Sequence, residues 1–210
     1  MLNRNLKYSF FCILFISSSV FADEKTSAEQ GEKGIEEFRQ GNLIQAMTLL
    51  NKSAASGYAP AQSTLAYILD QAEENDRAFT LFQQAAEKNY AAAQFGLGNM
   101  YAKGEGTKKD TVVAGQWIKK SALQLHAPAM RAYAYALESG SLGFKKNTQQ
   151  ALHWYMKCNQ ATDVVCTRRL FSIYNNGELG QAVNLQKASE FKQQLEQPLE
   201  NKKVNHENKK

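Results

Sequence analysis

Small and bulky apolar residues recur among polar ones in a pattern that repeats along most of the chain. Five segments align on an alanine that is followed three residues later by a large apolar residue, and in the first three copies also by small residues at the seventh and eighth positions. Offsets of three, seven and eight lie on one helical face, so each segment predicts an amphipathic helix. The alanines, 32, 36, 37 and 37 residues apart, are Ala46, Ala78, Ala114, Ala151 and Ala188, and the large residues are Leu49, Leu81, Trp117, Trp154 and Phe191.

The residue four positions before each alanine is expected to begin the helix. Four of these five residues are types whose side-chain oxygen can accept a hydrogen bond from an N–H group of the first turn. They are Asn42, Asp110, Asn147 and Asn184, and the fifth residue is Glu74. We call the five predicted helices the B helices.

A second helical pattern precedes each B helix. It consists of a small residue followed at intervals of four by two apolar residues, and the first unit keeps only Gly34 and Phe38 of it. The four fuller copies are Ala61, Leu65 and Leu69; Ala93, Leu97 and Tyr101; Ala129, Tyr133 and Leu137; and Cys166, Leu170 and Tyr174. We call these the A helices, and glycines mark most of the turns between A and B. Because one pair cannot bury its apolar stripes alone, the chain is predicted to be all-α, an α-solenoid of about five stacked helix-turn-helix repeats over residues 28–196.

One repeat carries a family pattern. The segment AAAQFGLGNMYAKGEGTKKDTVVAGQWIKKSA resembles a Sel-1-like repeat, and the units on either side resemble it less closely. The matching residues are Ala93, Leu97, Gly98, Tyr101, Gly104, Gly106, Lys109, Asp110, Ala114, Trp117 and Ala122. The resemblance implies an α-solenoid akin to tetratricopeptide arrays, used to bind proteins and not to catalyse reactions.

The amino-terminal segment predicts export. Residues 1–22 hold Arg4 and Lys7, then an apolar stretch, and end in Val20-Phe21-Ala22, which suits cleavage after Ala22. The apolar stretch is too short for a permanent membrane span, which needs about 20 residues. We therefore expect a signal peptide over residues 1–22, a short linker over 23–27, a periplasmic or secreted location and no stable membrane insertion.

Charge argues against a nucleic-acid partner. Loss of residues 1–22 lowers the formal charge from +5 to +3, and residues 197–210 account for +2 of this through four lysines against Glu200 and Glu207. The predicted solenoid is therefore nearly neutral, whereas nucleic-acid binding favours a basic face. Residues 197–210 are expected to be a disordered charged tail; the alternative is that their lysines contact an anionic envelope surface.

Two cysteines remain once Cys12 leaves with the signal peptide. Cys158 ends one B helix and Cys166 begins the next A helix, at small positions that the repeat register makes neighbours, so a disulfide is expected in an oxidising compartment. The spacing also resembles that of secreted cysteine-rich Sel-1-like proteins, which join helix B to the following helix A in this way. A metal site has only His153 nearby as a further ligand, and a redox centre more often has two residues between its cysteines.

No catalytic or cofactor signature is present in the sequence. The histidines, His126, His153 and His206, have no companions at metal or triad spacing. Ser189 and Lys192 match the serine-x-x-lysine spacing of penicillin-recognising enzymes, but no partner motif accompanies them. We predict no catalytic residue, no metal and no cofactor.

A partner surface is expected on the A helices, on residues that packing does not use. Exposed aromatic and arginine side chains favour interface centres. The candidates are Tyr67, Phe95, Asn99, Arg131, Tyr135, Glu138 and Arg168. The alternative for Phe95 and Tyr135 is that they fill gaps between repeats.

The sequence therefore favours an exported, non-catalytic scaffold that binds a peptide or protein partner of unknown identity in a concave groove. Two alternatives remain: an enzyme acting on cell-wall or β-lactam compounds, suggested by the Ser189 and Lys192 pair, and a secreted effector that uses the same groove on a host protein.

Overall fold

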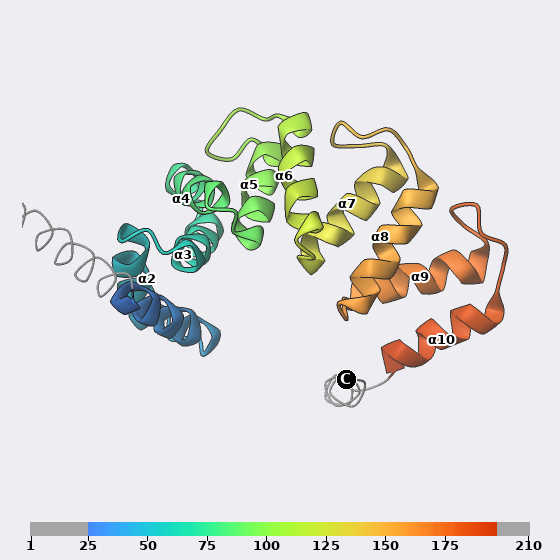
Figure 1. The fold of residues 1–210 in the computed structure, drawn as a ribbon, viewed down its shortest axis with the longest axis horizontal. Helices are drawn as coiled ribbons and strands as arrows, with labels where there is room; N and C mark the ends of the chain where they lie inside the picture. Colours follow the sequence, from blue (N-terminus) through green and yellow to red (C-terminus); the bar gives the residue numbers. More distant parts are fainter. Residues whose placement is uncertain (1–24, 197–210) are drawn as a thin grey trace, which may run out of the picture. The chain divides into compact units, whose positions relative to one another are not determined.

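The computed structural model describes residues 25–196, all of whose regular elements are helices (Figure 1). The predicted signal peptide, the first residues of the linker and the charged tail lie outside this range. The helices are one over residues 25–39, then α2 (Leu43–Ala55), α3 (Ala59–Gln71), α4 (Asn75–Glu87), α5 (Ala91–Lys103), α6 (Thr111–Leu123), α7 (Ala127–Ser139), α8 (Thr148–Gln160), α9 (Val164–Asn176) and α10 (Leu185–Glu196). The prediction of five helix-turn-helix repeats is confirmed, with α2, α4, α6, α8 and α10 as the B helices.

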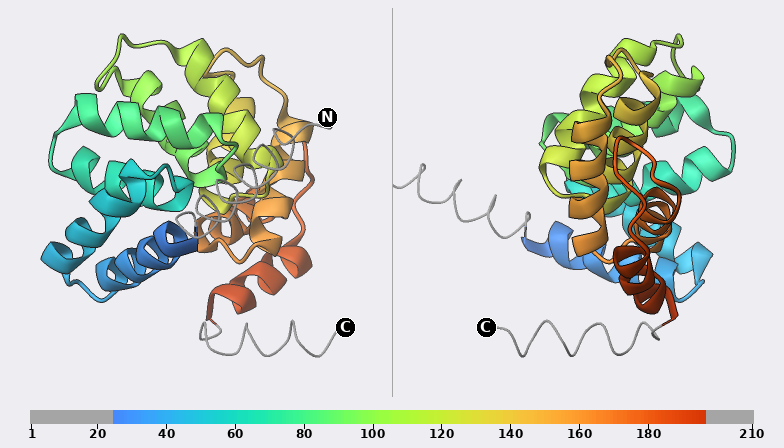
Figure 2. Two further views of the ribbon diagram at one scale, coloured as in Figure 1. Left: turned by 60° about the vertical axis from the view of Figure 1, so that its left-hand side comes forward. Right: turned by 90° about the vertical axis from the view of Figure 1, so that its right-hand side faces the viewer.

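The chain divides into two compact units between Ala93 and Gln94, within α5. In the first unit α3 packs against both α2 and α4. In the second, α7 packs against α6 and α8, and α9 packs against α8 and α10 (Figure 1 and Figure 2). Each A helix named here therefore contacts the B helix before it and the B helix after it, as expected for stacked pairs.

The alanine stripe forms the centre of both cores. The five anchor alanines are at most 2% exposed. The bulky residues buried most deeply on the B helices, however, stand four positions after the alanine and not three: Leu50, Phe82, Ile118 and Tyr155, each at most 4% exposed. The residues at the third position in these helices range from half-buried to buried, with Trp154 9% exposed and packed edge to face against Tyr133 at 5.2 Å between ring centroids. Both positions lie on the buried face, and the fourth points more directly at the neighbouring A helices.

Three of the four predicted N-caps are present. Asp110 accepts hydrogen bonds from the N–H groups of Val112 and Val113 at 3.0 Å, and Asn147 and Asn184 each accept one at 2.9 Å. The prediction for Asn42 is wrong, because its amide donates to Glu37 at 2.8 Å instead. The backbone explains the difference: Asp110 and Asn147 are extended, with ψ of 100° and 92°, whereas Asn42 has ψ of 65°.

Every junction from a B helix to the next A helix turns through a left-handed residue at the same repeat position. The φ values are 86° at Gly57, 63° at Asn89, 62° at Leu125 and 62° at Thr162. Glycine adopts this conformation without strain, while a β-branched residue is strained there. The junction that carries Thr162 is also the one that the two cysteines flank.

We expect Thr162→Gly to raise the free energy of unfolding by about 0.5–1 kcal/mol, because relief of left-handed strain exceeds the entropy that glycine adds to the unfolded chain. Guanidinium denaturation monitored by tryptophan fluorescence measures the change. The matched control is Ala161→Gly, where φ is −80° and glycine should destabilise by about 0.5–1 kcal/mol. Destabilisation by both variants would contradict the prediction.

Candidate functional site

The seven candidate partner-binding residues are divided between the two units. Tyr67 lies on α3 in the first unit, where its ring is 49% exposed and meets Phe38 edge to face at 6.1 Å. The other six lie in the second unit on α5, α7 and α9. The structure therefore describes a common surface for these six alone.

Two ion pairs join α7 to α9. Arg131 donates to the carboxylate of Asp163 at 2.7 Å, and Arg169 donates to the carboxylate of Glu138. Asp163 and Glu138 are only 10% and 20% exposed at the side chain, so both pairs are substantially shielded from water. Arg131 and Glu138, which the sequence suggested as partner contacts, are thus engaged within the chain.

The second ion pair is part of a larger polar network. Glu138 also accepts a hydrogen bond from the hydroxyl of Tyr155 at 2.7 Å, and Arg169 donates to Glu178, in the turn after α9, at 2.6 Å. Side-chain hydrogen bonds from Asn176, Arg169 and Ser172 lower the pKa of Glu178 to about 2. Burial and the bond to Glu138 raise the pKa of Tyr155, which keeps its hydroxyl protonated as a donor. The network ties α7, α8 and α9 together.

We expect Glu178→Gln to lower the free energy of unfolding by about 1 kcal/mol at pH 7, the scale of a partly exposed ion pair, since the Glu178 side chain is 32% exposed. Its pKa is lower in the folded state than the ordinary 4.5, so its contribution is complete above about pH 4.5 and is lost as the pH falls towards about 2. Denaturation of both proteins between pH 2 and pH 7 measures this. A stability difference that stays constant over that range would contradict the assignment.

Tyr135 is the most exposed aromatic side chain among the described residues. It stands one helical turn from Arg131 and from Glu138 on the same face of α7, and it is 62% exposed. It therefore does not fill a gap between repeats. On α9, Arg168 is exposed and makes no ion pair or hydrogen bond with any described residue.

Phe95 and Asn99 on α5 are half-buried. Phe95 packs against the core of the second unit, and its ring lies 5.5 Å from that of His126, between centroids. For Phe95 this geometry favours the gap-filling alternative. Burial lowers the pKa of His126, whose Nδ1 atom is buried without a hydrogen-bond partner.

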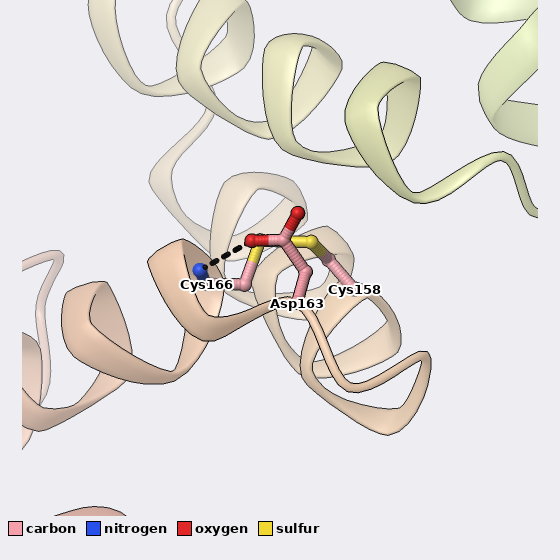
Figure 3. Close-up of side chains that lie close together, drawn as sticks. All are labelled: Cys158, Asp163 and Cys166. Atoms are coloured by element: carbon pink, nitrogen blue, oxygen red, sulfur yellow. Dashed lines mark hydrogen bonds between the residues drawn. A yellow bond between two sulfur atoms is a disulfide. The ribbon is translucent and has the colours of Figure 1, made fainter. Parts of the chain in front are cut away.

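Cys158 and Cys166 form a disulfide at the junction of α8 and α9 (Figure 3). Their Cα atoms are 5.9 Å apart, and both residues are fully buried. The carboxylate of Asp163 lies beside the sulfurs, and the ligand atoms of the three residues are all within 4.8 Å of one another. Such a cluster could suggest a metal site, but metal ligation requires thiolates, and the disulfide occupies both sulfurs.

Asp163 has two other functions. Its Oδ1 atom accepts hydrogen bonds from the N–H groups of Val165 at 2.9 Å and Cys166 at 3.0 Å, which caps α9. Its Oδ2 atom accepts from Arg131. Sequence reasoning missed both functions, although an aspartate directly before an apolar helical segment is an N-cap signal. It also missed Arg169 and Glu178, for which the spacing offers no signal, because their pairing depends on how α7 and α9 align.

The serine and lysine of the enzyme alternative lie exposed on α10. Lys192 faces Glu196 at 3.8 Å. A serine nucleophile needs a base within hydrogen-bond reach, and the structure gives Ser189 no such bond to Lys192 among the described residues. Of the histidines, His126 precedes α7, His153 lies on α8, and His206 is outside the described range. Within residues 25–196, no helix is both long and apolar enough to span a bilayer.

Comparison with known proteins gives consistent results. The family model described as "Sel1 repeat" matches residues 29–58, 61–90, 91–124 and 127–157. The Sel1-repeat-containing protein YjcO of Escherichia coli K12 is 35% identical over 133 residues, which cover 58% of each chain. HRD3A of Arabidopsis thaliana, an ERAD-associated E3 ubiquitin-protein ligase component, is 30% identical over 122 residues, 50% of this chain and 18% of that protein. The match thus spans less than two thirds of either relative.

A solved structure shares the fold. The crystal structure of a Sel1 repeat protein from Oxalobacter formigenes superposes with a TM-score of 0.65 at 32% identity, over 77% of this chain and 67% of that one. The predicted solenoid class is therefore confirmed. The fourth match of the family model ends at residue 157, immediately before the disulfide junction.

Proposed function

Because the chain belongs to the Sel1 repeat family, we propose that it is an exported, non-catalytic scaffold that binds a peptide or protein partner on its A helices. Sel1-repeat proteins generally act as protein-interaction scaffolds, and one relative is named as a component of a multiprotein ligase. The proposal locates the contact on the exposed face of α7 and α9, centred on Tyr135 and Arg168. We call this the α7–α9 surface.

The exposure of Tyr135 between two ion pairs is the observation that carries the proposal. The pairs from Arg131 to Asp163 and from Arg169 to Glu138 hold α7 against α9 on either side of it along α7. Tyr135 is then a large aromatic group on a rigid support, which loses little conformational entropy on binding. Arg168, which has no described partner, supplies a neighbouring cation on the same pair of helices.

The test begins with crosslinking in intact cell envelopes and mass spectrometry, which identify a partner that can then be purified. We expect the double substitution Tyr135→Ala and Arg168→Ala to weaken binding of that partner by at least about 30-fold, the loss typical of an interface hot spot. The matched control is Leu123→Ala with Lys119→Ala, an exposed apolar residue and an exposed cation on α6. Equal affinities for the two double variants, with helicity unchanged by circular dichroism, would exclude the α7–α9 surface.

Export is supported by the leader pattern of residues 1–22 and by the disulfide, since disulfides persist mainly outside the cytosol. Mass spectrometry of the amino terminus, performed separately on periplasm and culture medium, tests this. We expect a mature chain that begins at Asp23. Recovery in the medium would support the host-directed alternative, and recovery of residues 1–22 on the folded protein would contradict export by this signal.

A further inference from the structure

A polar pocket in the first unit lies on residues that the α7–α9 surface does not use. It has a volume of about 560 Å³, which falls within the range of roughly 300–1,000 Å³ typical of ligand sites. Its wall is formed by α2 and α4, and α3 contributes Gln62 and Leu65. The remaining lining residues are Asn51, Ala54, Ala55, Asp76, Arg77, Thr80, Leu81 and Gln84.

Gln62 has an unused hydrogen-bond acceptor. The residue is only 3% exposed, and its Nε2 atom donates to the carbonyl of Ala54 at 3.2 Å and to Oε1 of Gln84 at 2.8 Å. Its Oε1 atom is buried and has no partner. Rotating the amide would place this oxygen against the carbonyl of Ala54, so its orientation is determined by the donor side. Buried amide oxygens are nearly always paired, and an unpaired one beside a pocket suggests a missing donor.

The corresponding glutamine of the next repeat shows what a satisfied site looks like. Gln94 stands one residue after the repeat alanine Ala93, as Gln62 stands one residue after Ala61. It is equally buried, at 2% exposed, and its Oε1 atom accepts a hydrogen bond from Gln124 at 2.7 Å. The repeat therefore accommodates a glutamine here with its oxygen paired, and in the first unit that pairing is absent.

The other groups of the pocket favour a cationic donor. The carboxylate of Asp76 makes no ion pair or hydrogen bond with any described residue, and the amide of Asn51 donates to Met47, which leaves its oxygen as an acceptor. The last turn of α2, with the negative end of its helix dipole, contributes Ala54 and Ala55. The one cation of the lining, Arg77, is held by Glu74 at 2.5 Å.

We propose that this pocket binds the lysine or arginine side chain of a partner polypeptide. The methylene stem packs on the apolar lining, chiefly Leu65 and Leu81, as long basic side chains do on apolar surfaces. The charged head donates to Oε1 of Gln62 and to the carboxylate of Asp76. The pocket is independent of the proposed function at the α7–α9 surface, and either can fail without the other.

Titration of the ¹⁵N-labelled protein with four capped amino acids tests the proposal. N-acetyl-lysine methylamide and N-acetyl-arginine methylamide should shift the side-chain amide resonances of Gln62 and Gln84 saturably, with dissociation constants on the order of 1 mM for ligands of this size. The neutral norleucine and citrulline analogues should bind at least about 10-fold more weakly. Equal binding of charged and neutral probes, or saturable shifts only elsewhere, would overturn it. Tighter binding of 1,5-diaminopentane than of the lysine probe would also overturn it, by indicating a free diamine as the occupant.

Two variants and a control connect the binding to the named atoms. Gln62→Met removes the unpaired oxygen at nearly constant volume, and Asp76→Asn removes the charge on the exposed side of α4, where folding is not at risk. Each should weaken the lysine probe by at least about fivefold, whereas Gln94→Met, at the corresponding position of the next repeat, should not change it. If Gln62→Met does not fold, Asp76→Asn alone decides. Undiminished binding by Asp76→Asn, or an equal loss in Gln94→Met, would contradict the site.

Discussion

Replacing Gly115 with alanine is expected to lower the free energy of unfolding of the second unit by about 3 kcal/mol. Gly115 lies on α6, and a Cβ atom there would stand 2.1 Å from the carbonyl oxygen of Leu142 and 2.9 Å from the ring of Phe144. Both contacts belong to the loop between α7 and α8, and a backbone atom cannot move aside as a flexible side chain can. The clash therefore requires the loop or the helix to shift.

Helix propensity acts in the opposite direction and does not prevail. Alanine is about 1 kcal/mol more favourable than glycine within a helix, so the steric strain has to exceed that gain. The exposed neighbour Gln116 provides the control, because Gln116→Ala changes propensity slightly and meets no loop. We expect its effect to be within about 0.5 kcal/mol.

Tryptophan fluorescence reports this unit selectively. The chain has two tryptophans, Trp117 and Trp154, and both lie in the second unit. The fluorescence transition in guanidinium therefore follows that unit even if the two units unfold separately. A Gly115→Ala protein as stable as the wild type would show that the loop does not rest on α6 as the structure has it.

Removal of the disulfide is expected to have the second largest effect. The double variant Cys158→Ala and Cys166→Ala should unfold with a free energy lower by about 2.5 kcal/mol, the loop-closure entropy for cysteines 8 residues apart. Alanine is the appropriate replacement, because small residues occupy these positions in the other repeats: Ser53, Ala85 and Ser121 correspond to Cys158, and Ala61, Ala93 and Ala129 to Cys166. The substitution therefore removes the crosslink and leaves little cavity.

A reducing agent provides the control for the disulfide. The wild type should become nearly as unstable as the double variant in dithiothreitol, and the double variant should not respond. The fluorescence of Trp154, on the same helix as Cys158, is the measurement. Equal stability of the wild type with and without reductant, after denaturation has exposed the sulfurs, would mean that the crosslink contributes nothing.

Features set within one helix could be predicted from the sequence. The alanine stripe, the pairing of A and B helices and the capping by Asp110, Asn147 and Asn184 depend on a helical period or on neighbouring residues, which the sequence displays directly. The disulfide also belongs here, because its two positions are fixed by the repeat register over one short junction. The family follows from the same residues.

The candidate site divides along the same line. The sequence selected Tyr135 and Arg168 as exposed A-helix residues, and both are exposed. It also selected Arg131 and Glu138, but it could not show that Asp163 and Arg169, 32 and 31 residues away, pair with them. Such pairing depends on the rotation and offset of one helix against the next, and a one-residue change in either would separate the charges.

The sequence by itself thus determined which residues form helices, which face of each helix is buried and where two cysteines meet, because these follow from periodicity and from short separations along the chain. The tertiary structure alone decided which polar side chains are paired within the chain and which remain open to a partner. Tyr135 and the oxygen of Gln62 have their present environments because neighbouring helices pack at one particular offset, and no local pattern of residues encodes that offset.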